Sequence, residues 1–594
     1  MSLDLTPEQR KLGKDNFAQA AADLERQKQA AEAKEGKDAP TRRTFMKVAA
    51  AAGAVVPLSA AVYFGYDAWK GNKAVKVALI GTGDEGCVLV GEHNPEYTEI
   101  VAVCDVRPWN LDRVFKESGG PRKGLNKMYG EETAKKVKKY LSVEALLADK
   151  DKLGLEGVII ATPLVTHHTI AMQCMDAGLH VLCEKLMARR IRYCKDMIAK
   201  GVEKGLLLSV GHQRHYSMLY AHAREVVDSG VLGDLKHIRA LWHRNNSWPK
   251  TFTAKEKAEF DKTFDLPMYG DTWYPPVRKM DTARYEPDEL KKLALLPDGE
   301  AYQLADKAKA LGYTDVEQLV RWRTYNATGG GLMAELGSHQ LDAASIFLGK
   351  VHPLRVVGTG VRSFYSKEHT TDKDGFKVSR NPRECEDGVF VTFEFPGKNY
   401  AKDANDKVVV TYSSFSTNGF EQYGEHLMGS RGNLVIEKEA SAFLFREMEP
   451  GSKAGAKETT VTVSGGDGKK PALEAASTWG GGGGAAINKG PAAPEWDTDI
   501  RGYRTEMEHF AFLIRRQQKE KLPGSELYKK SADGKYANAD ALPRCHGEVA
   551  LADAIIALTA NMAMAKGQPI DFEHDWFDAA KLDAVPETKH EKQG

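Results

Sequence analysis

A glycine-rich turn near residue 80 has the residue types and spacing that bind a dinucleotide. The stretch from Ala74 to Ile80 is predicted to be a buried strand, and it leads directly into a G-x-G-x-x-G motif that opens a helical pattern. In such a motif the first glycine permits a tight turn, the second lets the backbone approach a pyrophosphate, and the third lets the helix pack closely on the strand. The free N–H groups of the helix N-terminus then face the phosphates. The residues predicted to contact the cofactor here are Gly81, Thr82, Gly83, Asp84, Glu85 and Gly86.

An acidic residue stands where such a site binds the ribose. A second strand is predicted from Glu99 to Cys104, and it ends in Asp105, about 20 residues beyond the third glycine. A carboxylate at this position accepts a hydrogen bond from the ribose 2′-hydroxyl, which favours NAD. Arg107, two residues later, is able to pair with the 2′-phosphate of NADP. We therefore predict a site for NAD or NADP, with NAD favoured.

Strands continue to alternate with helices up to about residue 210. Further strands are predicted at Gly157 to Ala161 and at His180 to Cys183, each following a helical stretch. This alternation predicts an α/β fold, a Rossmann-type doubly wound parallel sheet whose ligand lies at the carboxyl ends of the strands. His167 at the mouth of that crevice either contacts the cofactor or serves the fold. The residues predicted at these strand ends are Thr162, Pro163, His167, Glu184 and Lys185.

The region ahead of this domain resembles a twin-arginine export signal. Arg42 and Arg43 precede Val48 to Tyr66, a moderately apolar stretch of nineteen uncharged residues. We therefore expect the twin-arginine export machinery to be a partner, and the protein to be periplasmic or anchored to the outer face of the inner membrane. Small residues from Ser59 to Ala61 offer a cleavage site, but the stretch is also long enough to span a bilayer as an uncleaved anchor. The alternative is an amphipathic N-terminal helix with a chance arginine pair.

Composition narrows the function further. The 594 residues are 42% hydrophobic and 28% charged, with a formal net charge of +1. This balance is typical of a globular protein and offers no overall field for nucleic acid, which we exclude as a partner. The seven cysteines fall mostly in apolar patterns and lack metal-ligand spacing, so we expect neither a disulfide framework nor a metal site.

Several separated motifs together resemble the glucose-fructose oxidoreductase, inositol dehydrogenase and rhizopine-catabolism (Gfo/Idh/MocA) family. They are VALIGTGDEG with VCDVRP, then ATPLVTH, then AGLHVLCEKL, and then GGGLMAELGSHQLD at Gly329 to Asp342. The resemblance implies that the Rossmann domain is followed by an α/β domain with a large open, mostly antiparallel sheet. It also implies a homo-oligomer, a dimer or tetramer, because that sheet usually mediates assembly in the family.

The resemblance also assigns catalytic roles. Lys185 stands at the position of the family lysine that reaches the reacting hydroxyl, and Glu335 and His339 match an acidic-x-x-x-His motif whose members lie one helical turn apart. Histidine titrates near neutral pH, so we expect His339 to act as general acid or base. Lys185 is then its electrostatic and proton-relay partner, and Glu335 orients the histidine or binds a sugar hydroxyl. Leu186 replaces the usual proline, and Glu335 replaces the commoner aspartate.

Two arginines are candidates for the substrate. Arg214 begins the second domain and either binds substrate or satisfies backbone carbonyls, whereas Arg323 leads into the Gly-rich motif as a substrate clamp. The aromatic insertion at 248–322 suits a sugar or a subunit contact. The Gly-rich stretch at 465–494 is predicted to be a surface loop. The predicted domains are a leader or anchor over 1–72, the NAD(P)-binding domain over 73–210, the substrate and oligomerisation domain over 211–575, and a tail over 576–594.

Export and a nicotinamide cofactor together constrain the reaction. A protein exported in folded form works where no free nicotinamide pool is expected, so we predict a tightly bound NAD or NADP and a redox-neutral cycle. The expected activity is hydride transfer between this cofactor and a hydroxyl or ketone of a sugar or polyol. Two alternatives stay open: a redox-neutral NAD-dependent glycoside hydrolase of the same superfamily, and a non-catalytic sugar-binding protein on the same fold.

Overall fold

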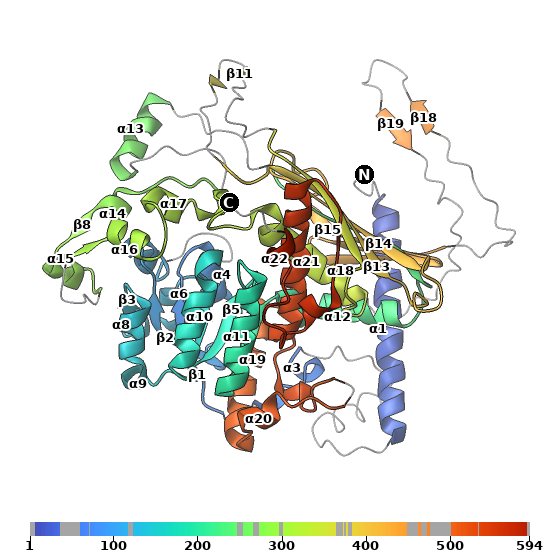
Figure 1. Ribbon diagram of the computed structural model, residues 1–594, viewed down its shortest axis with the longest axis horizontal. Coiled ribbons are helices and arrows are strands. Elements are labelled where there is room, and N and C mark those ends of the chain that lie inside the picture. Colours follow the sequence, from blue (N-terminus) through green and yellow to red (C-terminus); the bar gives the residue numbers. More distant parts are fainter. Residues whose placement is uncertain are drawn as a thin grey trace, which may run out of the picture.

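The computed structural model describes most of the chain. The described residues are 6–35, 60–69, 72–116, 123–245, 253–264, 273–295, 301–363, 372–373, 376–377, 383–447, 461–464, 472–475, 501–532 and 534–590. The paired arginines of the leader and most of the predicted Gly-rich loop at 465–494 lie outside these ranges. Figure 1 shows two bodies, a parallel sheet flanked by helices and a larger sheet backed by helices.

A six-stranded sheet forms the first body, with every strand parallel to its neighbours in the order β3-β2-β1-β4-β5-β6. Its apolar side chains alternate between two buried clusters, because successive residues of a strand point to opposite faces. Helices α10 and α11 cover one face, and α4 and α19 cover the other. The predicted doubly wound fold is confirmed. The bounds are β1 (Val75–Ile80), β2 (Thr98–Cys104), β3 (Lys138–Tyr140), β4 (Gly157–Ile160), β5 (His180–Glu184), β6 (Leu208–Gly211), α4 (Asp84–Glu92), α10 (His167–Asp176), α11 (Ile191–Lys204) and α19 (Tyr503–Glu520).

Helix α19 comes from near the end of the chain and completes this first body. Its residues Met507, Phe510 and Ile514 are buried in the same cluster as the alternate side chains of β1 and β2. The chain therefore returns to the Rossmann sheet about 300 residues after leaving it, within the stretch that we predicted as a continuous second domain.

The second body is an eight-stranded mixed sheet in the order β17-β16-β15-β7-β14-β13-β10-β20. All neighbours pair antiparallel except β14 and β7, which confirms the expected large and mostly antiparallel sheet. Helices α12, α18 and α21 pack on one face. The bounds are β7 (Leu235–His243), β10 (Arg355–Val361), β13 (Gly388–Pro396), β14 (Lys407–Phe415), β15 (Tyr423–Gly429), β16 (Gly432–Glu437), β17 (Ser441–Arg446), β20 (Ile570–Asp571), α12 (Met218–Asp228), α18 (Ser338–Phe347) and α21 (Gly547–Lys566).

Among the described residues, α21 is the one helix long and apolar enough to cross a membrane. It is mostly buried inside the protein, where it contacts α11, α18 and β10. Its hydrophobicity is therefore that of a core helix shared by the two bodies.

Helix α1 (Pro7–Glu35) lies along the outermost strand of the large sheet (Figure 1). The Asn16 side-chain amide donates to the backbone carbonyl of Leu444 in β17 at 3.0 Å, and Phe17 is buried. An exposed edge strand invites pairing with other chains, and covering it with a helix prevents this. The segment before the paired arginines is thus docked on the folded protein.

The described part of the predicted insertion packs on the Rossmann body. Its buried residues, including Val277, Leu290, Tyr302 and Leu319, join the cluster that also contains the side chains of β1 and β2. Figure 1 shows these short elements in green above the blue strands. The bounds are α13 (Ala254–Thr263), α14 (Lys279–Thr282), β8 (Arg284–Tyr285), α15 (Pro287–Lys292), β9 (Tyr302–Gln303), α16 (Leu304–Ala310) and α17 (Val316–Val320).

We expect Lys195→Met to release the C-terminal segment. Lys195 is fully buried in α11, and its ammonium donates to the carbonyls of Asp578, Lys581 and Ala584 at 2.7 to 2.9 Å. Methionine keeps the packing but leaves those buried acceptors without a donor, which should cost about 3 kcal/mol in the free energy of unfolding. Denaturant unfolding and limited proteolysis measure this. Lys204→Met, at the exposed end of the same helix, should change neither, and equal behaviour of the two variants would contradict the assignment.

Candidate active site

A cavity of about 830 Å³ opens at the carboxyl ends of β1, β2, β4 and β5. One wall consists of the turns that follow these strands. The opposite wall is the insertion, which contributes Pro275, Arg278, Tyr313 and Trp322. The cavity thus lies where we predicted the ligand, at the carboxyl ends of the strands. Its second wall is the insertion, which we had assigned to substrate or to a subunit contact.

The glycine-rich turn has the shape that a pyrophosphate requires. Gly81 has a φ of +92°, and a Cβ on Gly86 would lie 2.1 Å from the Gly81 carbonyl oxygen. A Cβ on Gly83 would meet no atom within 4 Å, so its backbone faces open space in the cavity wall. Asp84 and Glu85 begin α4 and line the same wall, whereas Thr82 is buried. The turn therefore fits a dinucleotide.

The carboxylate of Asp105 holds this turn in place. It accepts hydrogen bonds from the backbone N–H groups of Thr82 and Arg107, each at 2.8 Å, and from the side-chain amide of Asn110 at 3.0 Å. The Thr82 hydroxyl also donates to it, at 3.2 Å, so Oδ2 has three hydrogen-bond partners within the protein and Oδ1 has one. Asp105 also lines the cavity, where Oδ1 has room to accept from a ribose hydroxyl.

Arg107, beside the predicted ribose position, is paired with an acidic residue. Its guanidinium forms a two-point ion pair with the fully buried Asp281 of the insertion, at 3.0 and 2.7 Å. No sequence pattern predicts this partner, because 174 positions separate the two residues.

Thr162, Pro163 and His167 form the turn after β4. Thr162 and Pro163 line the cavity, and the buried His167 ring bridges the carbonyls of Thr162 and Leu186 at 2.9 Å each. His167 therefore links the turn after β4 to the turn after β5. These two hydrogen bonds give His167 a role in the fold. His167 also lines the cavity.

Lys185, Glu335 and Arg323 meet in the wall of the cavity. The Lys185 ammonium donates to the backbone carbonyl of Glu335 at 2.9 Å, and Arg323 donates to the Glu335 carboxylate at 2.8 Å. Burial alone would raise the pKa of Glu335, but Arg323 and Lys185 outweigh it, so the pKa lies below its ordinary value. Glu335 is therefore ionised, and the guanidinium of Arg323 pairs with its carboxylate.

His339 lies behind these three residues and does not itself line the cavity. Residues Met333–Gly337 form a π-helical turn, the element η5, where we had predicted a regular helical turn. Such wide turns are frequent at functional sites. The His339 ring lies 5.3 Å from the ring of Trp242, centre to centre. Burial, together with the charges of Lys185 and Arg214, holds its pKa well below the ordinary value, so the imidazole is neutral.

Glu184 and Arg214 are both buried. Burial and the nearby charge of Glu85 raise the pKa of Glu184, which favours its protonated form. The guanidinium of Arg214 pairs with Glu439 and donates to the carbonyl of His339. Arg214 does not line the cavity, so the structure favours its alternative role, in which it satisfies a backbone carbonyl.

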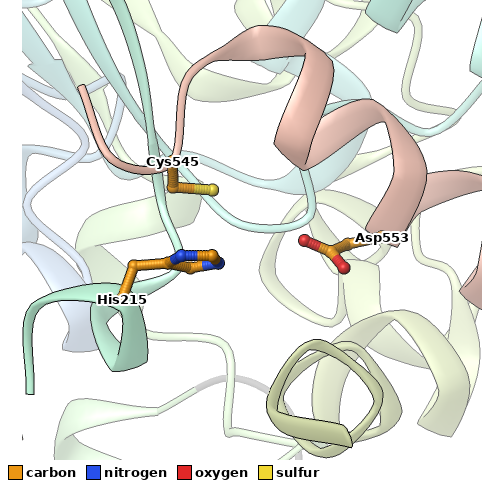
Figure 2. Close-up of side chains that lie close together, drawn as sticks. All are labelled: His215, Cys545 and Asp553. Carbon is orange, nitrogen blue, oxygen red and sulfur yellow. The ribbon is translucent and has the colours of Figure 1, made fainter. Parts of the chain in front are cut away.

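A second polar cluster lies beyond His339, and the sequence did not indicate it. Figure 2 shows His215, Cys545 and Asp553 converging on one space, with spacing that would suit a metal ion. The ammonium of Lys350 already stands there, 2.6 Å from Asp342 and 3.2 Å from Asp553. A lysine thus supplies the positive charge that these buried carboxylates need.

Family models match both bodies. The model "Oxidoreductase family, NAD-binding Rossmann fold" matches residues 75–212, and "Oxidoreductase family, C-terminal alpha/beta domain" matches residues 306–527. Together they cover more than half of the chain. The protein belongs to the Gfo/Idh/MocA oxidoreductase family. Its first body is accordingly an NAD-binding Rossmann domain.

Individual relatives of this Gfo/Idh/MocA protein match over shorter stretches. A "Glycosyl hydrolase family 109 protein" of Stenotrophomonas maltophilia is 31% identical over 29% of this chain and 37% of its own length. "Inositol 2-dehydrogenase 1" of Saccharopolyspora erythraea is 29% identical over 29% of this chain and 46% of its own length. The chain thus spans less than half the length of these curated relatives.

Solved structures resemble the Gfo/Idh/MocA protein over a longer range but with low identity. An inositol dehydrogenase homolog from Azotobacter vinelandii, complexed with NADH and myo-inositol, has a TM-score of 0.49 and 14% identity, and covers 84% of this chain and 98% of its own. An aldose-aldose oxidoreductase from Caulobacter crescentus, complexed with glycerol, has a TM-score of 0.47 and 15% identity, with coverage of 84% and 100%.

Two glycine variants should separate folding of the Gfo/Idh/MocA site from cofactor binding. In Gly86→Ala the new methyl collides with the Gly81 carbonyl, so we expect both a lower melting temperature and loss of NADH binding. In Gly83→Ala the methyl meets no protein atom and instead occupies the approach to the pyrophosphate, so binding should fall without a loss of stability. Thermal unfolding and NADH fluorescence titration measure the two effects. NADH binding by Gly83→Ala at wild-type strength would contradict the assignment of this turn.

Proposed function

We propose that the protein transfers hydride between a tightly bound nicotinamide cofactor and a hydroxyl or ketone of a sugar or polyol. The observation that carries this proposal is that Lys185 and an ionised Glu335 line the cofactor cavity with a neutral His339 behind them. The relative named as an inositol 2-dehydrogenase supports a polyol as substrate.

The bound nicotinamide supplies the hydride acceptor or donor, and the residues manage the proton and the substrate. Lys185 lines the cavity and has two ammonium protons left after its bond to the Glu335 carbonyl, so it stabilises the alkoxide that forms as hydride leaves. Glu335 accepts hydrogen bonds from neighbouring sugar hydroxyls. His339 is neutral, and the nearby charge of Lys185 helps to lower its pKa. In oxidation Lys185 takes the hydroxyl proton as it passes one of its own protons to His339, and in reduction the transfers run in reverse.

The second part of the proposal is that the cofactor stays bound from one turnover to the next. The insertion forms a wall along the cofactor cavity, which supports slow exchange of the dinucleotide. The proposed export through the twin-arginine route, to the periplasm or the outer face of the inner membrane, makes exchange with a free pool impractical. A resident cofactor requires a redox-neutral cycle, in which one substrate or substrate position is oxidised and another is reduced.

A redox-neutral glycoside hydrolase is the second candidate function. The relative named as a glycosyl hydrolase family 109 protein favours it, since its identity of 31% is slightly higher than that of the inositol dehydrogenase. In this reaction the sugar is oxidised transiently so that the glycosidic bond eliminates the leaving alcohol, water then adds to the resulting double bond, and the hydride returns to the ketone. A sugar-binding protein without catalysis is the third candidate, and the presence of Lys185, Glu335 and His339 together weighs against it.

Assembly through the large sheet completes the proposal. On β10 and β13 the residues Val356 and Val391 point into the core, whereas Val357 and Phe390 on the opposite face are 44% and 41% exposed. Apolar side chains on an open sheet face support a homo-oligomer that buries this face.

Replacing Lys185 or His339 should slow hydride transfer without removing the cofactor. We expect Lys185→Met and His339→Asn each to lower kcat by about 10²–10⁴-fold, the usual contribution of a positioned proton-transfer group. NADH fluorescence titration should give wild-type affinity for both variants. Lys204→Met is the matched lysine control on the protein surface. Full activity in the Lys185→Met/His339→Asn double variant would refute the catalytic assignments.

The pH dependence of oxidation should reflect the low pKa of His339. A group whose pKa is lowered by burial and neighbouring positive charge is already deprotonated at pH 6.5, the ordinary histidine value. We therefore expect kcat to show no histidine inflection between about pH 6 and 8, and to fall only at lower pH where His339 gains a proton. A stopped-flow pH profile measures this, and an inflection near 6.5 that disappears in His339→Asn would contradict it.

Purification without added nucleotide tests residency and separates the candidate functions. We expect about one NAD per chain to survive gel filtration and to be reduced when a sugar or polyol is added. Release of nitrophenol from a nitrophenyl glycoside, with no net change in NAD, would identify the glycoside hydrolase. Protein that emerges empty and binds NAD weakly would refute the resident cofactor.

A further inference from the structure

The insertion reaches the part of the cofactor site that recognises the ribose. Asp281 in α14 accepts two hydrogen bonds from the guanidinium of Arg107, and the hydroxyl of Tyr302 donates to the carbonyl of Val106. Both contacts hold the turn between β2 and α5 (Pro108–Arg113), the turn that begins with Asp105. The insertion is remote in sequence from this turn, but its contacts hold the turn in place. The choice between NAD and NADP depends on that turn.

Asp281 is built into this contact. Its side chain is fully buried, and besides Arg107 it accepts from the backbone N–H of Arg278 at 3.1 Å. The side chain of Arg107 is 17% exposed and lines the cavity. In this ion pair, Asp281 is buried inside the protein and Arg107 lies in the wall of the cofactor cavity.

Two of the three arginines at this end of the cavity are paired with aspartates. Arg113 pairs with Asp84 at 2.6 Å and Arg107 with Asp281, whereas the guanidinium of Arg278 lies 3.8 Å from the centre of the Trp109 ring. NADP differs from NAD by a 2′-phosphate with a charge near −2. The charge of Arg107 is already compensated by Asp281 before such a group binds.

We propose that Asp281 makes the site selective for NAD by holding Arg107 away from the position of a 2′-phosphate. Arg107 stands two residues after Asp105, where an arginine otherwise recognises that phosphate. Asp281 engages Nε and one Nη of this guanidinium and compensates its charge, so the remaining N–H groups carry no uncompensated charge for a second anion. Asp105 meanwhile accepts from the 2′-hydroxyl of NAD and repels a phosphate in the same place.

This inference rests on the dinucleotide part of the proposed function and not on the sugar chemistry. Its test is therefore a binding measurement. Wild-type and variant protein are equilibrated with equimolar NADH and NADPH until exchange is complete and then separated from free nucleotide. The bound nucleotides are released by denaturation and quantified, and their ratio gives the relative affinity even when exchange is slow.

The decisive variant is Asp281→Asn, which removes the charge and keeps the shape. We expect the bound NADPH/NADH ratio to rise by about tenfold or more over wild type, as one charge-assisted hydrogen bond allows. The double variant Arg107→Met/Asp281→Asn should lose this gain, because the gain requires the Arg107 guanidinium. Asp288→Asn, an exposed aspartate of the same insertion, is the matched control and should leave the ratio unchanged.

Three results would overturn the proposal. The first is a folded Asp281→Asn protein, with wild-type circular dichroism, whose ratio is unchanged. The second is a gain that persists in the double variant. The third is wild-type protein that already holds NADPH as well as NADH, which would mean that Arg278 or Arg113 supplies the phosphate contact. Failure of sugar to reduce the bound NAD would instead count against the proposed function and leave this ratio interpretable.

Discussion

Parallel strands bring all their carboxyl ends to one edge of a sheet, and nearly every group proposed to touch the cofactor or substrate depends on that edge. The glycine-rich turn follows β1, Asp105 follows β2, and Lys185 follows β5. Backbone hydrogen bonds between neighbouring strands fix the distances among these turns, and side-chain contacts then refine them. The bridge of His167 between the turns after β4 and β5 is one such contact.

Burial and neighbouring charges together determine the ionisation of the proposed catalytic groups. His339 is neutral because desolvation and nearby cations both disfavour its charged form, whereas Glu335 stays ionised because Arg323 and Lys185 outweigh its desolvation. A neutral proton acceptor beside an ionised carboxylate and an ammonium is a useful arrangement for removing a hydroxyl proton at neutral pH. The same principle explains the buried cluster beyond His339, where Lys350 compensates the carboxylates of Asp342 and Asp553.

The insertion adds a wall to the cavity at the Rossmann sheet. Asp281 and Tyr302 attach it to the turn after β2, and Arg278 and Trp322 line the cavity beside that turn. The proposed cofactor choice and the proposed slow exchange therefore both depend on this one segment.

The sequence by itself determined those features that depend on local patterns. Strand β1 was predicted from Ala74 to Ile80 and spans Val75–Ile80, and the cofactor turn, Lys185 and the Glu335–His339 pair were all assigned from motifs. Strand β15 was missed because Gly424, Glu425 and His426 lack strand character, and the buried Glu425 has partners remote in sequence, the Tyr220 hydroxyl at 2.8 Å and Arg214 at 3.4 Å. The tertiary structure alone decided that Arg107 pairs with Asp281, that Arg214 is buried away from the cavity, and that His339 lies behind the residues that line it. These outcomes depend on contacts between residues far apart in the chain and on a π-helical turn, which no local pattern of residue types specifies.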